Sequence, residues 1–167
     1  MAKDSIKLYV NQLASKEPVP GGGSASALVA ALGAGLLEKA CNLTIGKEKF
    51  KQKEAEFVRI LKIIAPIRKR LIELIEEDQK GYLPLAKANK MPRNTSQQEI
   101  YRKKCIQRAL KGAIKVPKEI KQLSDKLLRY CEKIESDGNP SLIGDVRCAK
   151  VLLEAVSKSS VNFFGGV

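Results

Sequence analysis

The chain has 167 residues, 44% of them hydrophobic and 29% charged, with a formal net charge of +13. This balance excludes a disordered tail and suffices for one domain with its own core. Aromatic residues make up 5% and tryptophan is absent. No stretch shows the sustained alternation of polar and apolar residues that strands require. We therefore expect an all-α fold and a single domain over residues 1–167.

The positive charge is concentrated in one part of the chain. Residues 87–133 carry fourteen Lys or Arg against four Asp or Glu. Such a field attracts a polyanion: nucleic acid, an acidic membrane, or a ligand with several carboxylates or phosphates. A solvated face of a lysine-rich helical protein gives the same pattern, so the charge alone does not decide between them.

Targeting and metal-binding signals are both missing from the sequence. Residues 1–15 mix polar and apolar side chains, unlike a signal peptide, and the longest apolar run, residues 25–37, is too short to span a bilayer. There is no histidine, and the four cysteines are scattered without a CxxC pair: Cys41, Cys105, Cys131 and Cys148. We expect a cytoplasmic protein with reduced cysteines, no membrane partner and no metal.

The first two helices are expected over residues 4–14 and 24–45. Pro18, Pro20 and three glycines separate them, and Gly46 ends the second helix. Residues 25–35 of that helix are small and apolar on every side, so we expect a central helix that is buried all round. Covering it on every side in a small domain indicates a partner subunit as well as neighbouring helices.

Four further helices follow in the pattern. A long helix is expected over residues 48–89, bent at Pro66 and Pro84. After the loop at 90–94, Thr95 with Gln98, or Ser96 with Glu99, forms a capping box that opens a helix. Another helix runs from about residue 117 to 137, and the last covers residues 141–163. The prediction is an antiparallel bundle of about six helices.

Two aspartates break the apolar pattern of their helices. In the long helix the apolar residues recur at steps of three and four, and Asp78 falls on the same core-facing stripe, one turn from Leu74 and from Tyr82. Burial is costly for a carboxylate unless it is paired or used, and it raises the pKa toward the range of proton transfer. Pairing with a lysine or capping of a neighbouring helix is the alternative for Asp78. Asp145 aligns with Ala149, Leu152 and Val156 on the inner face of the last helix, where it serves chemistry or complements the helix dipole.

A glycine-rich turn leads directly into the second helix. The string PGGGS, residues 20–24, lets backbone N–H groups turn toward a ligand at a helix N-terminus. It is neither a P-loop, because no GK[ST] follows, nor a GxGxxG fingerprint.

Several of these stretches, taken in order, resemble one known family. They are LAS at 13–15, PVPGGGS at 18–24, AALGA at 30–34, LTIGK at 43–47, DQKGY at 78–82, MPRNT at 91–95, GNP at 138–140 and DV at 145–146. Together they resemble the cyclodeaminase/methenyltetrahydrofolate cyclohydrolase domain of the formiminotransferase-cyclodeaminase family. The resemblance covers most of the chain and implies an all-α homodimer.

The resemblance also implies a function in folate one-carbon chemistry. One branch closes 5-formiminotetrahydrofolate to 5,10-methenyltetrahydrofolate with release of ammonia, and another hydrolyses the methenyl compound to 10-formyltetrahydrofolate. The substrate is then a tetrahydrofolate derivative, polyglutamylated in many cases, and no metal is needed. Asp78 and Asp145 are the expected catalytic residues. The expected substrate-binding residues are Gly21, Gly22, Gly23, Ser24, Lys47, Tyr82, Arg93 and Asn139.

Two alternatives to this function stay open. One is a non-catalytic basic helical module that binds nucleic acid or an acidic partner, against which the few aromatics and the lack of a nucleic-acid motif argue. The other is a degenerate family member that keeps only the dimer scaffold, because the resembling proteins continue from a residue comparable to Asn162 into a C-terminal helical segment that residues 1–167 lack.

Overall fold

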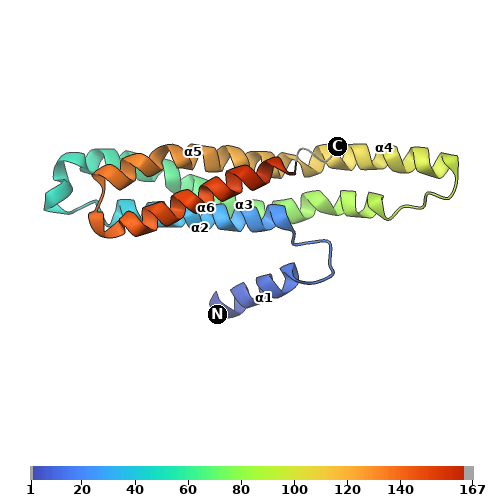
Figure 1. Cartoon of the computed structure of the whole chain (residues 1–167), viewed down its shortest axis with the longest axis horizontal. Coiled ribbons are helices and arrows are strands. Elements are labelled where there is room, and N and C mark those ends of the chain that lie inside the picture. The colour runs from blue at the N-terminus through green and yellow to red at the C-terminus, as the bar shows by residue number, and fades with distance from the viewer. Residues whose placement is uncertain (1, 164–167) are drawn as a thin grey trace.

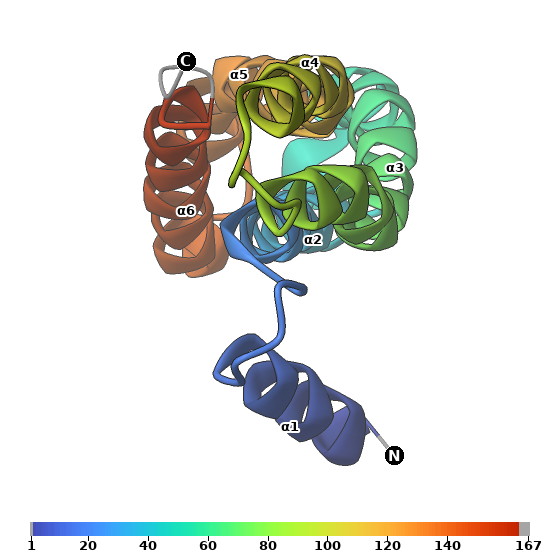
Figure 2. The same ribbon diagram turned by 90° about the vertical axis from the view of Figure 1, so that its right-hand side faces the viewer.

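The computed structural model describes residues 2–163, and within them it has six α-helices and no strand. Five helices form an elongated bundle, whereas α1 stands apart from it (Figures 1 and 2). The all-α prediction is confirmed, but the expected six-helix bundle is a five-helix bundle. The helices are α1 (Ala2–Leu13), α2 (Gly22–Asn42), α3 (Glu54–Asn89), α4 (Ser96–Ala113), α5 (Lys115–Asp137) and α6 (Ile143–Val161), with two 3-10 turns, η1 (Glu48–Lys53) and η2 (Pro140–Leu142).

Helix α2 lies along the bundle and packs most extensively against α3 and α6. Its small residues allow close approach: a Cβ added to Gly33 would lie 3.0 Å from Cγ of Leu153 on α6. The predicted burial is confirmed on the faces toward α3 and α6, whereas Leu32 is 56% exposed and Leu28 and Leu36 are only partly buried, on the side for which a partner subunit was predicted. Within the single chain, α2 is covered on one side and open on the other.

By length and composition, α2 as a whole could cross a membrane, although its longest apolar run, residues 25–37, is too short to do so. Of the described helices it alone passes this test, over its 21 residues. More than half of its most apolar window, 56%, is buried inside the bundle. The core helix of a soluble protein passes the same test.

Helix α3 spans 36 residues and continues through both Pro66 and Pro84. Residues 48–53, predicted to be its first turns, form η1 instead. The predicted core stripe is confirmed as far as Asp78, with these residues buried: Ile60, Ile64, Ile67, Leu71, Leu74 and Asp78. Helices α4 and α5 return along α3, which contacts both (Figure 1).

The ends of the later helices follow local signals. Thr95 caps α4 by accepting a hydrogen bond from the backbone N–H of Gln98 at 3.2 Å, as predicted. Pro117 lies in the first turn of α5, where its missing N–H costs little. The predicted inner stripe of α6 is confirmed at Ala149 and Val156, but Val146 and Leu153 are buried in place of their neighbours Asp145 and Leu152, and Asp145 lies at the edge of that face. The 3-10 turn η2 ahead of α6 winds more tightly than an α-helix and shifts the register.

Candidate functional site

A cavity of about 340 Å³ opens where the start of α2, the middle of α3, the α4–α5 junction and the end of α6 meet. It brings together five residues predicted for the site: Gly21, Gly22, Gly23, Asp78 and Tyr82. Its other walls are mostly apolar: Pro18, Val19, Leu85, Leu110, Ala113, Ile114, Pro117 and Phe163. A mostly apolar pocket with few polar groups is the usual form of a small-molecule site.

Asp78 has the one carboxyl group among the lining residues, and it is 9% exposed. Its carboxylate lies against the backbone of Gly23, so closely that a Cβ on residue 23 would come within 2.6 Å of the Asp78 Cγ. Burial raises the pKa of Asp78, and a hydrogen bond from the backbone N–H of Ser24 opposes that rise. The result is a desolvated carboxylate held by the first turn of α2.

Ser24 links three helices beneath the cavity. Its side chain is fully buried, and its hydroxyl lies 2.9 Å from the Tyr9 hydroxyl of α1. The same oxygen accepts a hydrogen bond from Nε2 of Gln79, the residue after Asp78, at 3.4 Å. Ser24 therefore serves as a positioning residue rather than as part of the cavity wall.

Phe163 is a lining residue that the sequence analysis missed. Its ring lies over the start of α2, and a Cβ added to Gly22 would lie 3.0 Å from its Cζ. With Tyr82 it gives the cavity two aromatic walls suited to a flat ring system. In the sequence Phe163 marks only the end of the last helix, and no local signal separates it from a helix-terminal core residue.

The remaining predicted residues lie away from this cavity. Arg93 is exposed in the loop between α3 and α4, and Lys47 is exposed at the start of η1. Asn139 donates to the backbone oxygen of Leu43 through its side-chain amide at 3.1 Å, and accepts from the backbone N–H of Ser141. These contacts fix the turn before α6.

Asp145 pairs with Lys39, whose Nζ lies 2.6 Å from the Asp145 Oδ2. Lys39 is near the end of α2, whereas Gly23 is at the start of α2, where it contacts Asp78 of α3. Sixteen residues at about 1.5 Å each separate Gly23 from Lys39, about 24 Å along the helix axis. One chain therefore does not bring Asp145 to Asp78.

A second cavity of about 270 Å³ lies at the Asp145 end of α2, lined by Lys49, Phe50, Gln52, Lys53, Ser136, Asp137, Gly138 and Pro140. Lys53 pairs with Asp137 at 2.7 Å and joins η1 to α5, and Lys133, also on α5, pairs with the same carboxylate at 2.7 Å. No group of three His, Cys, Asp or Glu side chains that could hold a metal occurs within residues 2–163.

The basic residues between 87 and 133, here called the basic surface, lie at the end of α3 and on α4 and α5, three of the helices that line the first cavity. Several of its cations have no acidic partner among the described residues: Lys87, Lys90, Lys104, Arg108, Lys111, Lys115 and Lys118. Lys111 and Lys115 flank Ala113 and Ile114 of the cavity wall. Unpaired cations beside a pocket attract an anionic ligand.

The family model for formiminotransferase-cyclodeaminase matches residues 5–163 of this sequence. The chain belongs to this family. A methenyltetrahydrofolate cyclohydrolase of Methylorubrum extorquens is 34% identical over 146 residues, which cover 87% of this chain and 70% of the relative.

Two other members of the formiminotransferase-cyclodeaminase family show how the chain compares in length and fold. A rat formimidoyltransferase-cyclodeaminase is 27% identical over 150 residues, and the chain spans only 28% of that protein. The crystal structure of a formiminotetrahydrofolate cyclodeaminase from Thermotoga maritima superposes with a TM-score of 0.80 at 27% identity, covering 94% of this chain and 74% of the other.

Proposed function

We propose that this enzyme of folate one-carbon chemistry is a methenyltetrahydrofolate cyclohydrolase, which converts 5,10-methenyltetrahydrofolate and water to 10-formyltetrahydrofolate. The observation that carries the proposal is the buried Asp78 carboxylate in an apolar cavity with two aromatic walls. The 34% identity to a cyclohydrolase over 70% of its length favours this branch of the family.

The chemistry needs one carboxylate that moves a proton. The methenyl carbon of the substrate is cationic and lies between N5 and N10. Water adds to that carbon and loses a proton to Asp78, giving a neutral tetrahedral carbon. As the bond from carbon to N5 breaks, Asp78 returns the proton to N5, and the hydroxyl proton leaves to solvent while the formyl carbonyl forms. Desolvation strengthens both the attraction of Asp78 to the cation and its basicity.

The cyclodeaminase reaction is the second candidate. The likeness to the Thermotoga maritima cyclodeaminase fold supports it. In that reaction N10 attacks the formimino carbon, the proton lost by N10 passes to the formimino nitrogen, and a protonated Asp78 donates the second proton with which that nitrogen leaves as ammonia. The raised pKa of Asp78 suits this acid role as well as the base role.

Initial rates with the two substrates distinguish the branches. The proposal predicts that purified protein accelerates loss of the near-ultraviolet absorbance of 5,10-methenyltetrahydrofolate over buffer, and releases no ammonia from 5-formiminotetrahydrofolate at a comparable rate. Ammonia release without methenyl hydrolysis would assign the cyclodeaminase instead.

The glutamate tail of folate is proposed to extend over the basic surface. Lys111 and Lys115 flank the cavity wall and lack acidic partners among residues 2–163. A polyglutamylated substrate then has a lower KM than the monoglutamate, and salt reduces the difference. The double variant Lys111→Gln/Lys115→Gln should remove most of that preference and leave kcat nearly unchanged. Lys7→Gln in α1, outside the basic surface, is the matched control.

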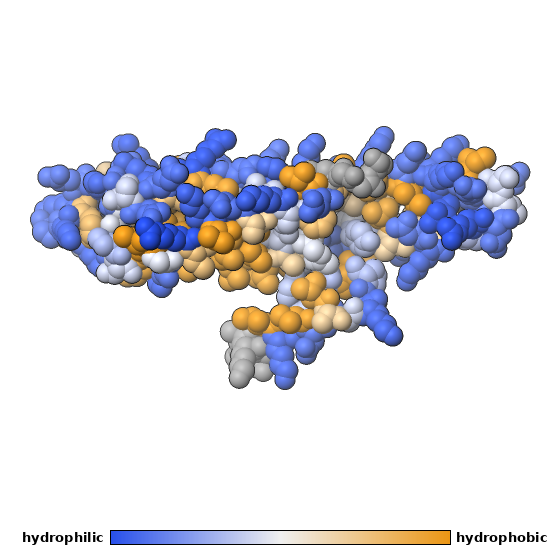
Figure 3. Space-filling model, in the orientation of Figure 1, coloured by the Kyte–Doolittle hydropathy of each residue, from blue (hydrophilic) through white to orange (hydrophobic). Residues whose placement is uncertain are grey.

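A homodimer is proposed as the working form. Apolar residues of α1 are exposed, namely Ile6, Leu8, Val10 and Leu13, as is Leu32 of α2. Figure 3 shows apolar side chains along the underside of the bundle and on the side of α1 that faces it. An exposed patch of this kind marks an interface.

The four free cysteines agree with a reducing, cytoplasmic location, which stays a prediction.

Sedimentation velocity tests the dimer. Leu32→Glu should convert the dimer to a folded monomer at micromolar concentration. Ile100→Glu, on α4 and equally exposed at 56%, should leave the dimer intact. A wild-type monomer at these concentrations would refute a stable homodimer.

A further inference from the structure

Most of the residues that the resemblance assigns to one site lie in two groups at opposite ends of α2, and Arg93 lies in neither. The first group, Gly21–Gly23, Asp78 and Tyr82, lines the 340 Å³ cavity. The second group, Lys47, Asn139 and Asp145, lies near the other end of α2, where Asp145 pairs with Lys39. About 24 Å of helix separates the groups within one chain.

The open face of α2 has the spacing of a helix–helix seam. Ala25, Leu28, Leu32, Leu36 and Lys39 recur at steps of three and four, and each is partly or largely exposed. The seam is centred on Leu32, which is the midpoint of the helix Gly22–Asn42. A seam with its most exposed apolar residue at the centre can pair with a second copy of itself.

Two-fold pairing of this seam brings the two groups together. In an antiparallel pair that crosses at Leu32, Ala25 of one chain lies opposite the partner's Lys39. Gly23 then lies within about 3 Å, measured along the axis, of the partner's Lys39, and the two helix axes are about 8–10 Å apart. The partner's Asp145, bound to that lysine, is carried to the same end.

Charge complements the pairing. The walls of the Asp78 cavity hold one carboxylate and no cation. The other end of α2 presents Lys39, Lys47 and Lys49, all exposed. Helix α1 stands away from its own bundle with an exposed apolar side, which suits an arm that packs on a second copy (Figure 2).

We propose that the active site is shared between two chains: the seam of α2 packs antiparallel about Leu32, and the partner's Lys39 and Asp145 complete the Asp78 cavity. This inference rests on the proposed function. Asp78 supplies the proton-transfer carboxylate of each site, and the partner's Asp145 supplies a second carboxylate at its mouth. Each dimer has two such sites.

Complementation between two inactive variants tests the shared site. Asp78→Asn and Asp145→Asn dimers should each lose at least about 100-fold in kcat/KM. A mixed dimer, purified through two different affinity tags, has one site with both aspartates and one with neither. It should recover about half of the wild-type rate, since one of its two symmetric sites is intact.

Two outcomes of this experiment overturn the proposal. If both aspartates act within one chain, each site of the mixed dimer lacks one of them and the mixed dimer stays inactive. If Asp145→Asn is as active as the wild type, the partner's Asp145 has no part in the site.

A crosslink tests the pairing without any activity. In a Cys105→Ser/Cys148→Ser background, Leu32→Cys should form a disulfide-linked dimer on mild oxidation, because the two-fold axis passes beside residue 32. Ile100→Cys is the control that should not. Efficient crosslinking in a protein that lacks folate activity would support the pairing while the proposed function fails. Absence of the Leu32→Cys crosslink would overturn the pairing even in an active enzyme.

Discussion

The backbone of Gly23 and the carboxylate of Asp78 are in direct contact, with no room between them for a side chain on residue 23. The contact joins the start of α2 to the middle of α3 and places the Ser24 N–H on the carboxylate. The glycine-rich turn is therefore a seat for Asp78 as well as a wall of the cavity.

Gly23→Ala should abolish most of the activity. The added methyl group overlaps the Asp78 carboxylate, which must leave its bond to the Ser24 N–H. We expect kcat/KM to fall about 100-fold or more, the usual size of an effect on a proton-transfer group. Gly112→Ala on α4, where a Cβ meets nothing within 4 Å, should keep full activity. Equal activities of the two variants would show that the Gly23 contact does not matter.

Asp78→Asn should stabilise the folded protein at neutral pH. The pKa of Asp78 is raised in the folded state by burial, so the ionised carboxylate costs folding free energy once the pH exceeds its unfolded pKa of about 3.9. The variant removes that cost, and each kcal/mol gained raises Tm by about 2–4 °C in a chain of this size. Thermal melts should show a higher Tm than wild type at pH 7 and little difference below pH about 4. A lower Tm at pH 7 would contradict the desolvation argument.

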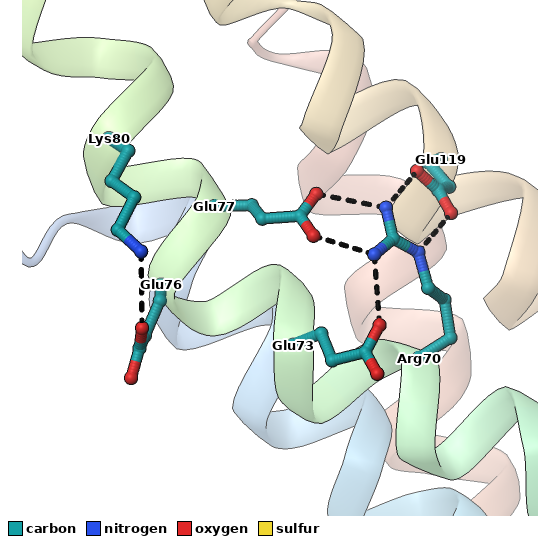
Figure 4. Close-up of polar contacts among 6 residues, drawn as sticks. All are labelled: Arg70, Glu73, Glu76, Glu77, Lys80 and Glu119. Carbon is teal, nitrogen blue, oxygen red and sulfur yellow. Dashed lines mark hydrogen bonds and ion pairs between the residues drawn. The ribbon is translucent and has the colours of Figure 1, made fainter.

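Arg70 binds three glutamates and joins α3 to α5 (Figure 4). Its guanidinium makes paired hydrogen bonds with Glu119, at 2.7 and 3.1 Å, and with Glu77, at 2.6 and 2.9 Å. Arg70→Ala should lower the free energy of unfolding by about 1 kcal/mol, a value that allows for solvent screening of these half-exposed groups. Lys80→Ala, which removes an exposed ion pair with Glu76 in the same region, should change it by less than about 0.5 kcal/mol.

The Arg70 effect should depend on pH. Its hydrogen bond lowers the pKa of Glu77, so the stability from this pair is present above the unfolded carboxyl pKa and is lost as the pH falls through the lowered value. Urea melts of wild type and Arg70→Ala should therefore differ most near pH 7 and converge in acid. A gap that widens in acid would mean that the carboxylates are not the partners that matter.

Tyr9→Phe should weaken the first turn of α2. The change removes the 2.9 Å hydrogen bond to Ser24 and leaves a fully buried hydroxyl with a single 3.4 Å contact from Gln79. Loss of one buried hydrogen bond costs about 1 kcal/mol in stability. Tyr101→Phe, which alters an exposed hydroxyl on α4, is the control and should not change Tm. Equal melting temperatures would mean that Tyr9 does not hold Ser24.

The sequence predicted the buried stripe of α3 well because one steady 3.6-residue pattern covers it. The stripe from Ile60 to Leu74 is buried and Asp78 lies on it, as expected. The prediction for α6 was right for Ala149 and Val156 but wrong by one residue for Leu152, because the pattern there is short and the preceding turn, η2, is a 3-10 turn. Helix phase depends on such turns, which local composition does not reveal.

The grouping of the site residues could not be predicted from one chain's sequence. The resemblance gave Asp78, Lys47, Asn139 and Asp145 as members of one site, but it carries no information on distance. The length of α2 separates them within the fold, and Leu32 at its midpoint is exposed, which is why we propose that a second chain packs there. Phe163 was missed because only the packing of α6 against the start of α2 makes it a cavity wall.

The role of Asp78 is tested by comparing wild type with Asp78→Asn in the hydrolysis of 5,10-methenyltetrahydrofolate, followed by its near-ultraviolet absorbance. We expect rapid loss of absorbance with wild type, and a rate at least about 100-fold lower with a folded Asp78→Asn protein. Hydrolysis by Asp78→Asn at the wild-type rate would contradict the assignment of Asp78 as the proton-transfer carboxylate.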